Sequence, residues 1–203
     1  MSVPTLDFWF DYASTYSYPA AMRVGRAAAD RRVAVRWRPF LLGPLFLAQQ
    51  GLSDSPFNVH AEKGAYMWRD LERICEAQGL PFKRPHRFPR NSLAAARATL
   101  ACEALDLDPG AFCRAVYTAN FAADADIADV GVLGEILQEI DYPGGEVLAR
   151  AQTDPVKDSL RANVEAARSL GLFGAPSFTT PDGELFWGHD RLDAALDWAA
   201  KAR

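Results

Sequence analysis

Ser14 is the residue of this 203-residue chain whose position best suits chemistry. It stands between an alternating apolar run and a segment with helical spacing, at the expected start of a helix. Backbone N–H groups at a helix N-terminus lack intrahelical partners and favour an anion, and a serine hydroxyl can donate a further hydrogen bond to that anion. A serine in this place is, taken alone, most often an N-cap that contributes about 1 kcal/mol. The position therefore predicts a cap, an anion site, or both.

The remaining nucleophiles and metal-binding side chains are scattered. The three cysteines, Cys75, Cys102 and Cys113, are odd in number, far apart and in helical-looking segments. This pattern favours buried thiols in a reducing compartment over a disulfide framework. No carboxylate or cysteine stands at a recognised metal spacing from any histidine, so we expect no metal site.

Composition excludes several classes of protein. Lys and Arg total 22 against 26 for Asp and Glu, the net charge is −4, and no basic stripe is present, so we expect no nucleic-acid partner. The N-terminus resembles no signal peptide, and no apolar run approaches the roughly 20 residues that cross a bilayer. We therefore expect a cytoplasmic protein without a membrane partner.

The elements around Ser14 follow from the periodicity of apolar residues. Residues 6–11 alternate as a strand, the segment from Tyr18 to Ala28 has helical spacing, and residues 33–37 alternate again, which predicts a parallel βαβ unit. From about residue 45 to 170 helices follow one another, over 63–78, from Asn91-Ser92 to 105, after Asp108-Pro109, after Asp129, and from Asp154-Pro155 to Gly171.

The C-terminal segment predicts a hairpin and a last helix. Residues 177–180 and 184–187 flank Pro181-Asp182-Gly183, a turn sequence, and a helix from about Arg191 would bury Leu192, Ala195, Leu196 and Ala199. We expect the aromatic residues Trp9, Trp37, Trp68, Phe178 and Trp198 in the core rather than on a base-stacking surface.

This order of elements resembles the DsbA-type thioredoxin-like proteins. The fold class expected is α/β: a thioredoxin-like domain of residues 1–43 and 171–203, built from βαβ plus ββα, with an all-helical domain of residues 44–170 inserted. In that architecture a Cys-x-x-Cys motif opens the first helix, where this chain has Ser14 and Ser17. Hydroxyls cannot carry out thiol–disulfide exchange, but the helix start could hold the sulfur of a small-molecule thiol, for which glutathione is the natural guest.

Four segments carry a more specific resemblance, to the 2-hydroxychromene-2-carboxylate isomerases and the related kappa-class glutathione transferases. They are residues 10–18, Asn58 with residues 63–73, residues 88–92, and residues 174–177 followed by 187–191. The segments stand in the family's order and span nearly the whole chain. The family usually has proline directly after the active serine, where this chain has Thr15.

The resemblance implies a role for each matching residue. Ser14 would hold the glutathione sulfur as a thiolate, and Ala175 would bind the cysteinyl part through its backbone, with Pro176 in the cis form. His189 and Asp190 would bind the γ-glutamyl end, and Asn58 would make another glutathione contact. We interpret Asp70 and Arg73 as an ordinary ion pair and leave them, with Lys63, outside the site.

The expected function is therefore a glutathione-dependent isomerase that interconverts 2-hydroxychromene-2-carboxylate and trans-o-hydroxybenzylidenepyruvate, in aromatic catabolism. Its partner would be a small aromatic substrate, and a homodimer is implied by the resemblance alone. Two alternatives stay open: a kappa-like glutathione transferase or peroxidase, and a non-catalytic thioredoxin-fold binding module.

Overall fold

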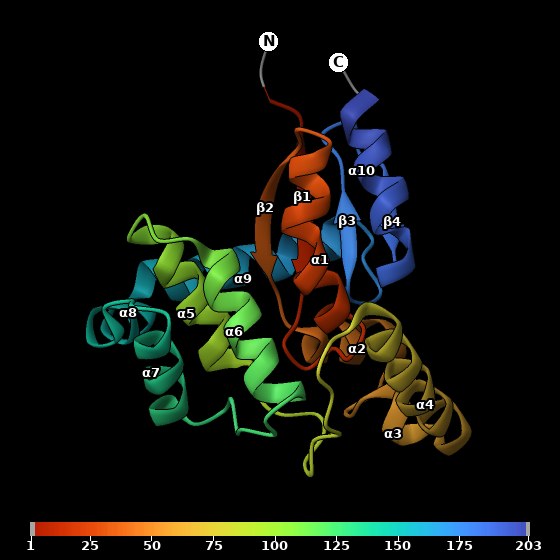
Figure 1. Cartoon of the computed structure of the whole chain (residues 1–203), viewed down its shortest axis with the longest axis horizontal. Helices are drawn as coiled ribbons and strands as arrows, with labels where there is room; N and C mark the ends of the chain where they lie inside the picture. Colours follow the sequence, from red (N-terminus) through yellow and green to blue (C-terminus); the bar gives the residue numbers. More distant parts are fainter. Residues whose placement is uncertain (1–2, 202–203) are drawn as a thin grey trace.

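The computed structural model describes residues 3–201 and places four strands in one mixed sheet (Figure 1). The strands are β1 (Thr5–Phe10), β2 (Ala34–Pro39), β3 (Ser177–Thr179) and β4 (Leu185–Trp187), in the order β2-β1-β3-β4. β1 is parallel to β2 and antiparallel to β3, and β3 and β4 form an antiparallel hairpin. The expected βαβ and ββα units are thus confirmed, and together they form the predicted thioredoxin-like sheet.

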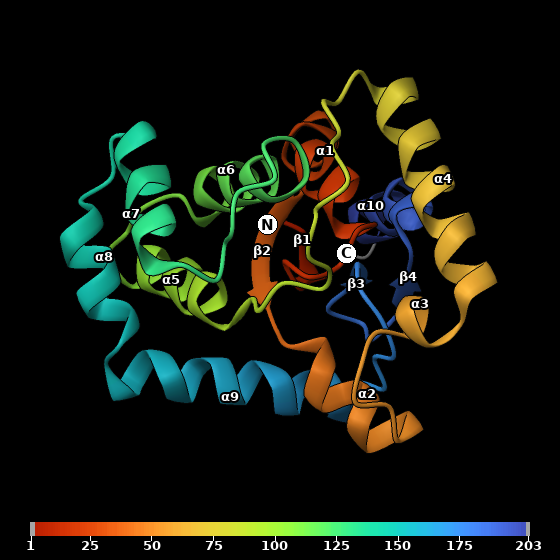
Figure 2. The same cartoon turned by 90° about the horizontal axis from the view of Figure 1, so that it is seen from below.

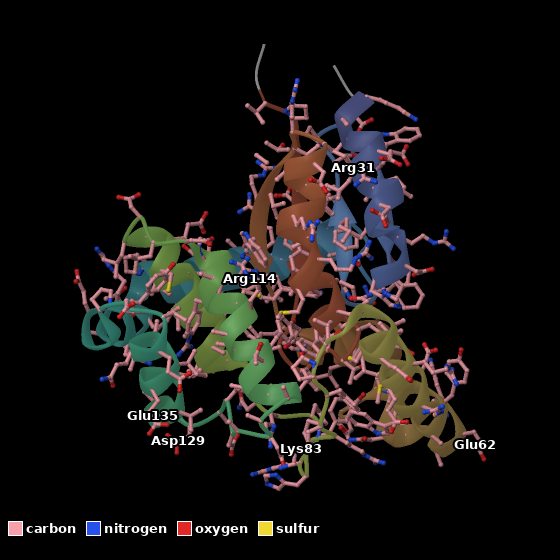
Figure 3. The ribbon with its side chains drawn as sticks, in the orientation of Figure 1. Arg31, Glu62, Lys83, Arg114, Asp129 and Glu135 are labelled. Atoms are coloured by element: carbon pink, nitrogen blue, oxygen red, sulfur yellow. The ribbon has the colours of Figure 1, made fainter. Side chains whose placement is uncertain are left out.

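Two helices cover one face of this sheet. They are α1 (Ser17–Asp30), which links β1 to β2, and α10 (Leu192–Lys201), which follows β4. Phe8 lies opposite Trp37 on β2 and Phe178 on β3, and all three side chains are buried. Arg31, the residue directly after α1, forms ion pairs with Asp193 and Asp197 of α10, which link the two helices at the surface (Figure 3).

Eight helices lie between β2 and β3 in the described chain (Figure 2). They are α2 (Leu42–Gln50), α3 (Pro56–Val59), α4 (Ala61–Gln78), α5 (Leu93–Ala104), α6 (Pro109–Phe121), α7 (Val130–Glu139), α8 (Gly144–Ala151) and α9 (Asp154–Ser169). The expected caps are present at two of them, because Asp108 accepts N–H bonds from the first turn of α6 and Asp129 accepts one from α7. The sequence did not predict α2, α3 or α8.

The helical segment shares its core with the sheet. Phe10 of β1 lies 6.2 Å from Tyr117 of α6 between ring centroids, and one continuous cluster of buried side chains includes both. The division into two domains at residues 43–44 and 170–171 stays a prediction.

The opposite face of the sheet is covered by the end of α9 and by α2. There Trp9 packs with Phe40, Leu45 and Leu172, and its indole N–H donates to the Thr179 hydroxyl at 2.8 Å. The prediction that Trp198 lies in the core is wrong: its side chain is 45% exposed, and its indole N–H donates to the carboxylate of Asp182. A helix as short as α10 presents only one face to the sheet, and Trp198 lies outside that face.

Candidate active site

Ser14 lies in a turn that leads into α1. The helix begins at Ser17, so Ser14 stands three residues before it rather than at its first residue. Its Oγ accepts the backbone N–H of Ser17, the first residue of α1, at 3.3 Å and donates to the carbonyl oxygen of Ala175 at 2.8 Å. The residue is almost fully buried, at 8% exposure. The N-cap position itself is Tyr16, so Ser14 supports the start of the helix from outside it and joins two segments 161 residues apart.

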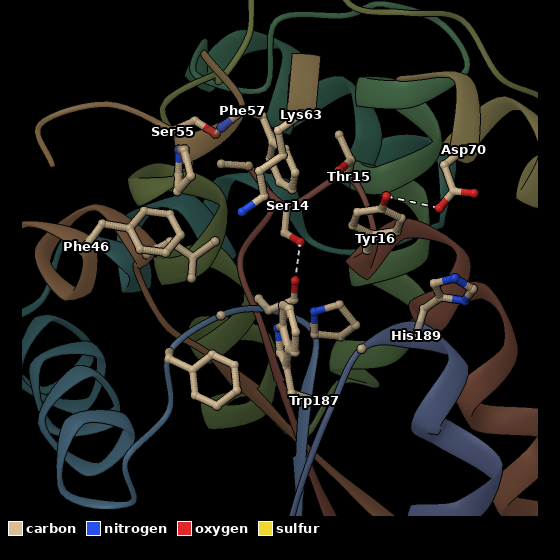
Figure 4. A pocket seen from close by; sticks show the side chains of 18 of the residues that line it. Ser14, Thr15, Tyr16, Phe46, Ser55, Phe57, Lys63, Asp70, Trp187 and His189 are labelled. Atoms are coloured by element: carbon tan, nitrogen blue, oxygen red, sulfur yellow. Dashed lines mark hydrogen bonds between the residues drawn. The ribbon is translucent and has the colours of Figure 1, made fainter. Parts of the chain in front are cut away.

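The segment that meets Ser14 enters β3. The peptide bond between Ala175 and Pro176 is cis, as the resemblance implies. The Ala175 carbonyl points at the Ser14 hydroxyl (Figure 4). On the other side, the Pro176 carbonyl accepts the N–H of Gly188, which ties this segment to the end of β4. The two backbone segments therefore sit beside each other at one edge of the site.

A cleft of about 700 Å³ opens in front of Ser14 and Ala175. Its volume is in the range of small-molecule sites. Seven of the residues that line it are aromatic: Tyr16, Phe46, Phe57, Tyr66, Phe88, Phe173 and Trp187. Such a lining favours a flat apolar ligand with a few polar groups.

One face of α4 supplies polar groups to the cleft that we did not predict. Lys63, Tyr66 and Asp70 stand three and four residues apart, the spacing of one helix face, and all line the cleft. Asp70 does pair with Arg73, at 2.9 Å, as expected. It also accepts the hydroxyl of Tyr16 at 3.1 Å. The shared spacing was a signal for this face, but an exposed helix face has the same pattern.

His189 packs against Tyr16 within the cleft. The two rings are stacked with centroids 5.7 Å apart and planes 7° apart. Burial lowers the pKa of His189, while the carboxylates of Asp190 and Asp70 act in the opposite direction. Because its ordinary pKa is already below neutrality, His189 is uncharged at pH 7. It can therefore offer one donor and one acceptor nitrogen to a ligand.

Asp190 follows His189 in a short 3-10 turn, His189–Arg191, which precedes α10. Its carboxylate lies over the backbone of Gly188, which has a φ of 109°. A Cβ at Gly188 would come within 2.5 Å of the Asp190 Oδ1. Only glycine accommodates both this backbone and this close approach. The chain at Gly188 thus allows Asp190 to face the cleft.

Asn58 is the predicted site residue that the structure leaves outside the cleft lining. Its amide donates to the carboxylate of Asp54 and to the carbonyl of Phe88, and the residue is exposed. Ser14, Ala175, Pro176, His189 and Asp190 all line the cleft. The structure therefore brings five of the six predicted residues together.

The chain's own thiols are poorly suited to act as nucleophiles. All three cysteines are buried, and burial raises the pKa of Cys75 to about 11 and that of Cys102 to about 12. Such thiols are protonated at neutral pH. Within residues 3–201 no three histidine, cysteine or acidic side chains gather as a metal site would require, and no helix is long and apolar enough to span a membrane.

Comparisons with known proteins find one matching family model and relatives of two named activities. The model of the DSBA-like thioredoxin domain family matches residues 5–198. A 2-hydroxychromene-2-carboxylate isomerase of Sphingobium xenophagum is 26% identical, over 93% of this chain and 94% of its own length. Glutathione S-transferase kappa 2 of Caenorhabditis elegans is 24% identical, over 96% of this chain and 91% of its own length. A solved structure of a 2-hydroxychromene-2-carboxylate isomerase superposes with a TM-score of 0.82 at 22% identity, covering 96% of this chain and 93% of that one.

Proposed function

The chain belongs to the DSBA-like thioredoxin domain family, and from that premise we propose that it is a glutathione-dependent isomerase of the 2-hydroxychromene-2-carboxylate type. The observation that carries the proposal is the Ser14 hydroxyl, which donates to the Ala175 carbonyl inside a cleft lined by seven aromatic residues. Relatives of both the isomerase and the transferase type cover nearly the whole chain, which supports an enzyme that uses glutathione.

The cleft fits glutathione in the chemistry of its polar groups. The Thr15 hydroxyl oxygen is buried, and residues 3–201 provide it with no hydrogen-bond partner, so a polar ligand would satisfy it. The Ala175 carbonyl would accept the cysteinyl N–H. Asp190 would bind the ammonium of the γ-glutamyl group, and neutral His189 would donate to its carboxylate. These groups line the same cleft as Ser14, which would hold the sulfur.

Glutathione supplies, when bound, a thiolate that adds to the conjugated substrate and is later eliminated, so that rotation in between occurs about a single bond. The Ser14 hydroxyl lowers the pKa of the thiol by donating a hydrogen bond to the sulfur. To do so, it gives up its hydrogen bond to the Ala175 carbonyl. The Ala175 carbonyl is then free for the ligand's N–H. The start of α1 adds a positive dipole end near the same place.

The rest of the cleft orients the second substrate. Phe46, Phe57 and Trp187 offer flat apolar surface for an aromatic ring and limit the access of water to the reacting atoms. The Lys63 ammonium lies 5.5 Å from the centroid of the Phe57 ring, at the wall that faces Ser14. A carboxylate on an aromatic substrate, or the glycine carboxylate of glutathione, would pair with it.

A kappa-like transferase or peroxidase would use the same thiolate, and the similarity to glutathione S-transferase kappa 2, over 96% of this chain, supports this second candidate. The reaction products separate the two. An isomerase converts hydroxychromene carboxylate while the concentration of free glutathione stays constant, whereas a transferase consumes it as a conjugate and a peroxidase as a disulfide. A cleft that serves only as a binding module would do neither.

Replacing Asp190 with alanine should weaken glutathione binding about tenfold, because the ligand ammonium loses its charged partner. Calorimetric titration of wild type and Asp190→Ala with reduced glutathione measures this directly. Asp197→Ala is the matched control, since it removes the same charge from α10 at a residue that does not line the cleft. Equal affinity of all three proteins would contradict the placement of the γ-glutamyl end, and a featureless wild-type titration would overturn the glutathione mechanism.

A further inference from the structure

Thr15, the neighbour of Ser14, carries a hydroxyl that the fold leaves without a partner. The residue is 1% exposed and lines the cleft. Its Oγ1 has no hydrogen-bond partner within residues 3–201. Buried hydroxyls nearly always form a hydrogen bond, because a buried hydroxyl without a partner destabilises the fold, whereas a methyl group in its place would not. An unpartnered hydroxyl beside the candidate sulfur position therefore calls for a functional explanation.

The hydroxyls of Ser14 and Thr15 differ in what they must give up. Ser14 already donates to the Ala175 carbonyl and accepts the N–H of Ser17. A bond from Ser14 to a ligand anion therefore replaces an existing bond. A bond from Thr15 replaces none, so its full strength would act on the ligand.

The backbone fixes Thr15 in this position. Its carbonyl accepts the N–H of Tyr18 at 3.2 Å, which makes Thr15 part of the turn that opens the 14-residue helix α1. Thr15 lines the cleft together with Ser14 and Tyr16, and Figure 4 shows its side chain above theirs in that view. Rotation about the Cα–Cβ bond exchanges the hydroxyl and methyl groups between staggered positions without moving this backbone.

We propose that Thr15 is a second hydrogen-bond donor to the ligand sulfur, so that the thiolate is held by two adjacent hydroxyls. The proposal rests on the proposed function, since it takes the thiol to be that of glutathione. Thr15 would then help to set the fraction of ionised thiol, and with it the rate at neutral pH. In this step the thiol proton leaves to solvent and the two O–H groups stay protonated. No other atom is transferred.

The test compares Thr15→Val with Thr15→Ser. Valine has the shape of threonine without the hydroxyl, and serine keeps the hydroxyl. The ultraviolet absorbance of the thiolate, followed against pH on the glutathione complex of each protein, gives the pKa of the bound thiol. We expect Thr15→Val to raise that pKa by about one unit, the effect of losing one charge-assisted hydrogen bond, and Thr15→Ser to leave it unchanged.

Ser17 offers a matched control for the loss of a buried hydroxyl. Its Oγ is also unpartnered within the described chain, but the residue does not line the cleft. Ser17→Ala should leave the thiol pKa at the wild-type value. The charged and titratable groups that face the cleft are the same in every variant: Tyr16, Lys63, Tyr66, Asp70, His189, Asp190 and Arg191.

Two further measurements separate the sulfur contact from a change in fold or in overall binding. S-methylglutathione has no ionisable thiol, so its affinity for Thr15→Val should equal that for wild type. The ligand-free Thr15→Val protein should melt at or above the wild-type temperature, because an unsatisfied hydroxyl has been replaced by a methyl group. Binding of glutathione with an unchanged thiol pKa in Thr15→Val would overturn the role of Thr15 alone. Absence of glutathione binding to wild type would overturn the proposed function together with it.

Discussion

Ser14→Ala should lower the isomerisation rate constant kcat/KM up to about tenfold at pH 7. Losing one charge-assisted hydrogen bond should raise the pKa of the bound thiol by about one unit, toward the value of about 8.5 of an unperturbed thiol, while the other proposed donors, Thr15 and the start of α1, remain. The alanine variant keeps the cleft and the Ala175 backbone but lacks the hydroxyl that donates to the sulfur. The measurement is the conversion of hydroxychromene carboxylate in the presence of reduced glutathione.

The pH dependence distinguishes this role from a cap. Loss of the donor raises the thiol pKa, so the variant should be most impaired at low pH and should approach wild type as the pH rises through about 8.5. If Ser14 only caps α1, the variant would melt at a lower temperature, by an amount that corresponds to about 1 kcal/mol, with the same pH profile as wild type. That second outcome would contradict the proposed role of Ser14.

Arg90→Met should destabilise the protein by about 3–5 kcal/mol, the usual cost of removing one partner from a buried charged network. The Arg90 side chain is 1% exposed. It donates to the carbonyl and side-chain oxygens of Asn120, at 3.2 and 2.7 Å, and to the backbone and carboxylate of Asp124. Methionine fills similar space but leaves these acceptors unpaired. Thermal unfolding should show a loss of roughly 10 °C for a chain of this length.

Arg87→Met is the control for this variant, because Arg87 is exposed in the same loop and its loss should change stability by no more than about 0.5 kcal/mol. A similar melting temperature for Arg90→Met and wild type would contradict the prediction.

Acidification provides an independent check of the same network. Contacts with Arg90 and His86 lower the pKa of Asp124. A carboxylate whose pKa is lowered by folding contributes stability above its unfolded value, about 4, and this contribution is lost as the pH falls through its folded pKa. Wild type should therefore lose more stability than Arg90→Met on acidification below about pH 4, as measured by denaturant unfolding at each pH.

Arg90 also matters for the site, because its partner Asn120 reaches the active-site segment. The Asn120 amide donates to the Tyr12 carbonyl at 3.0 Å, two residues before Ser14. The neighbouring Asp11 carboxylate accepts the N–H groups of Ala13 and Leu42 and is 3% exposed, and burial raises its pKa. The turn that carries Ser14 is thus fixed by buried polar groups.

Much of the fold was predictable because it follows from local patterns. The alternation of residues 6–11 predicted β1, and Pro181-Asp182-Gly183 predicted the turn between β3 and β4. Asp108-Pro109 predicted the start of α6 through a cap that the structure contains. Helices α2, α3 and α8 were not predicted, since they are short and owe their stability to packing against the rest of the protein.

The sequence by itself determined where the elements begin and end, and the family resemblance implied which segments at those ends form the site. Ser14 lies before α1, Ala175-Pro176 before β3 and His189-Asp190 after β4, and all of them line the cleft.

Only the tertiary structure decided which other side chains join them. Lys63 and Asp70 line the cleft, although their helical spacing equally suits an exposed face. The Thr15 hydroxyl has no hydrogen-bond partner within residues 3–201. Asn58 donates to Asp54 and Phe88 and does not line the cleft. The physical reason is that these side chains depend on how α3 and α4 pack against segments distant in sequence: Asn58 meets Phe88, 30 residues away, and Asp70 meets Tyr16, 54 residues away. Such packing is fixed by the sum of many buried contacts, and no local pattern of residue types encodes it.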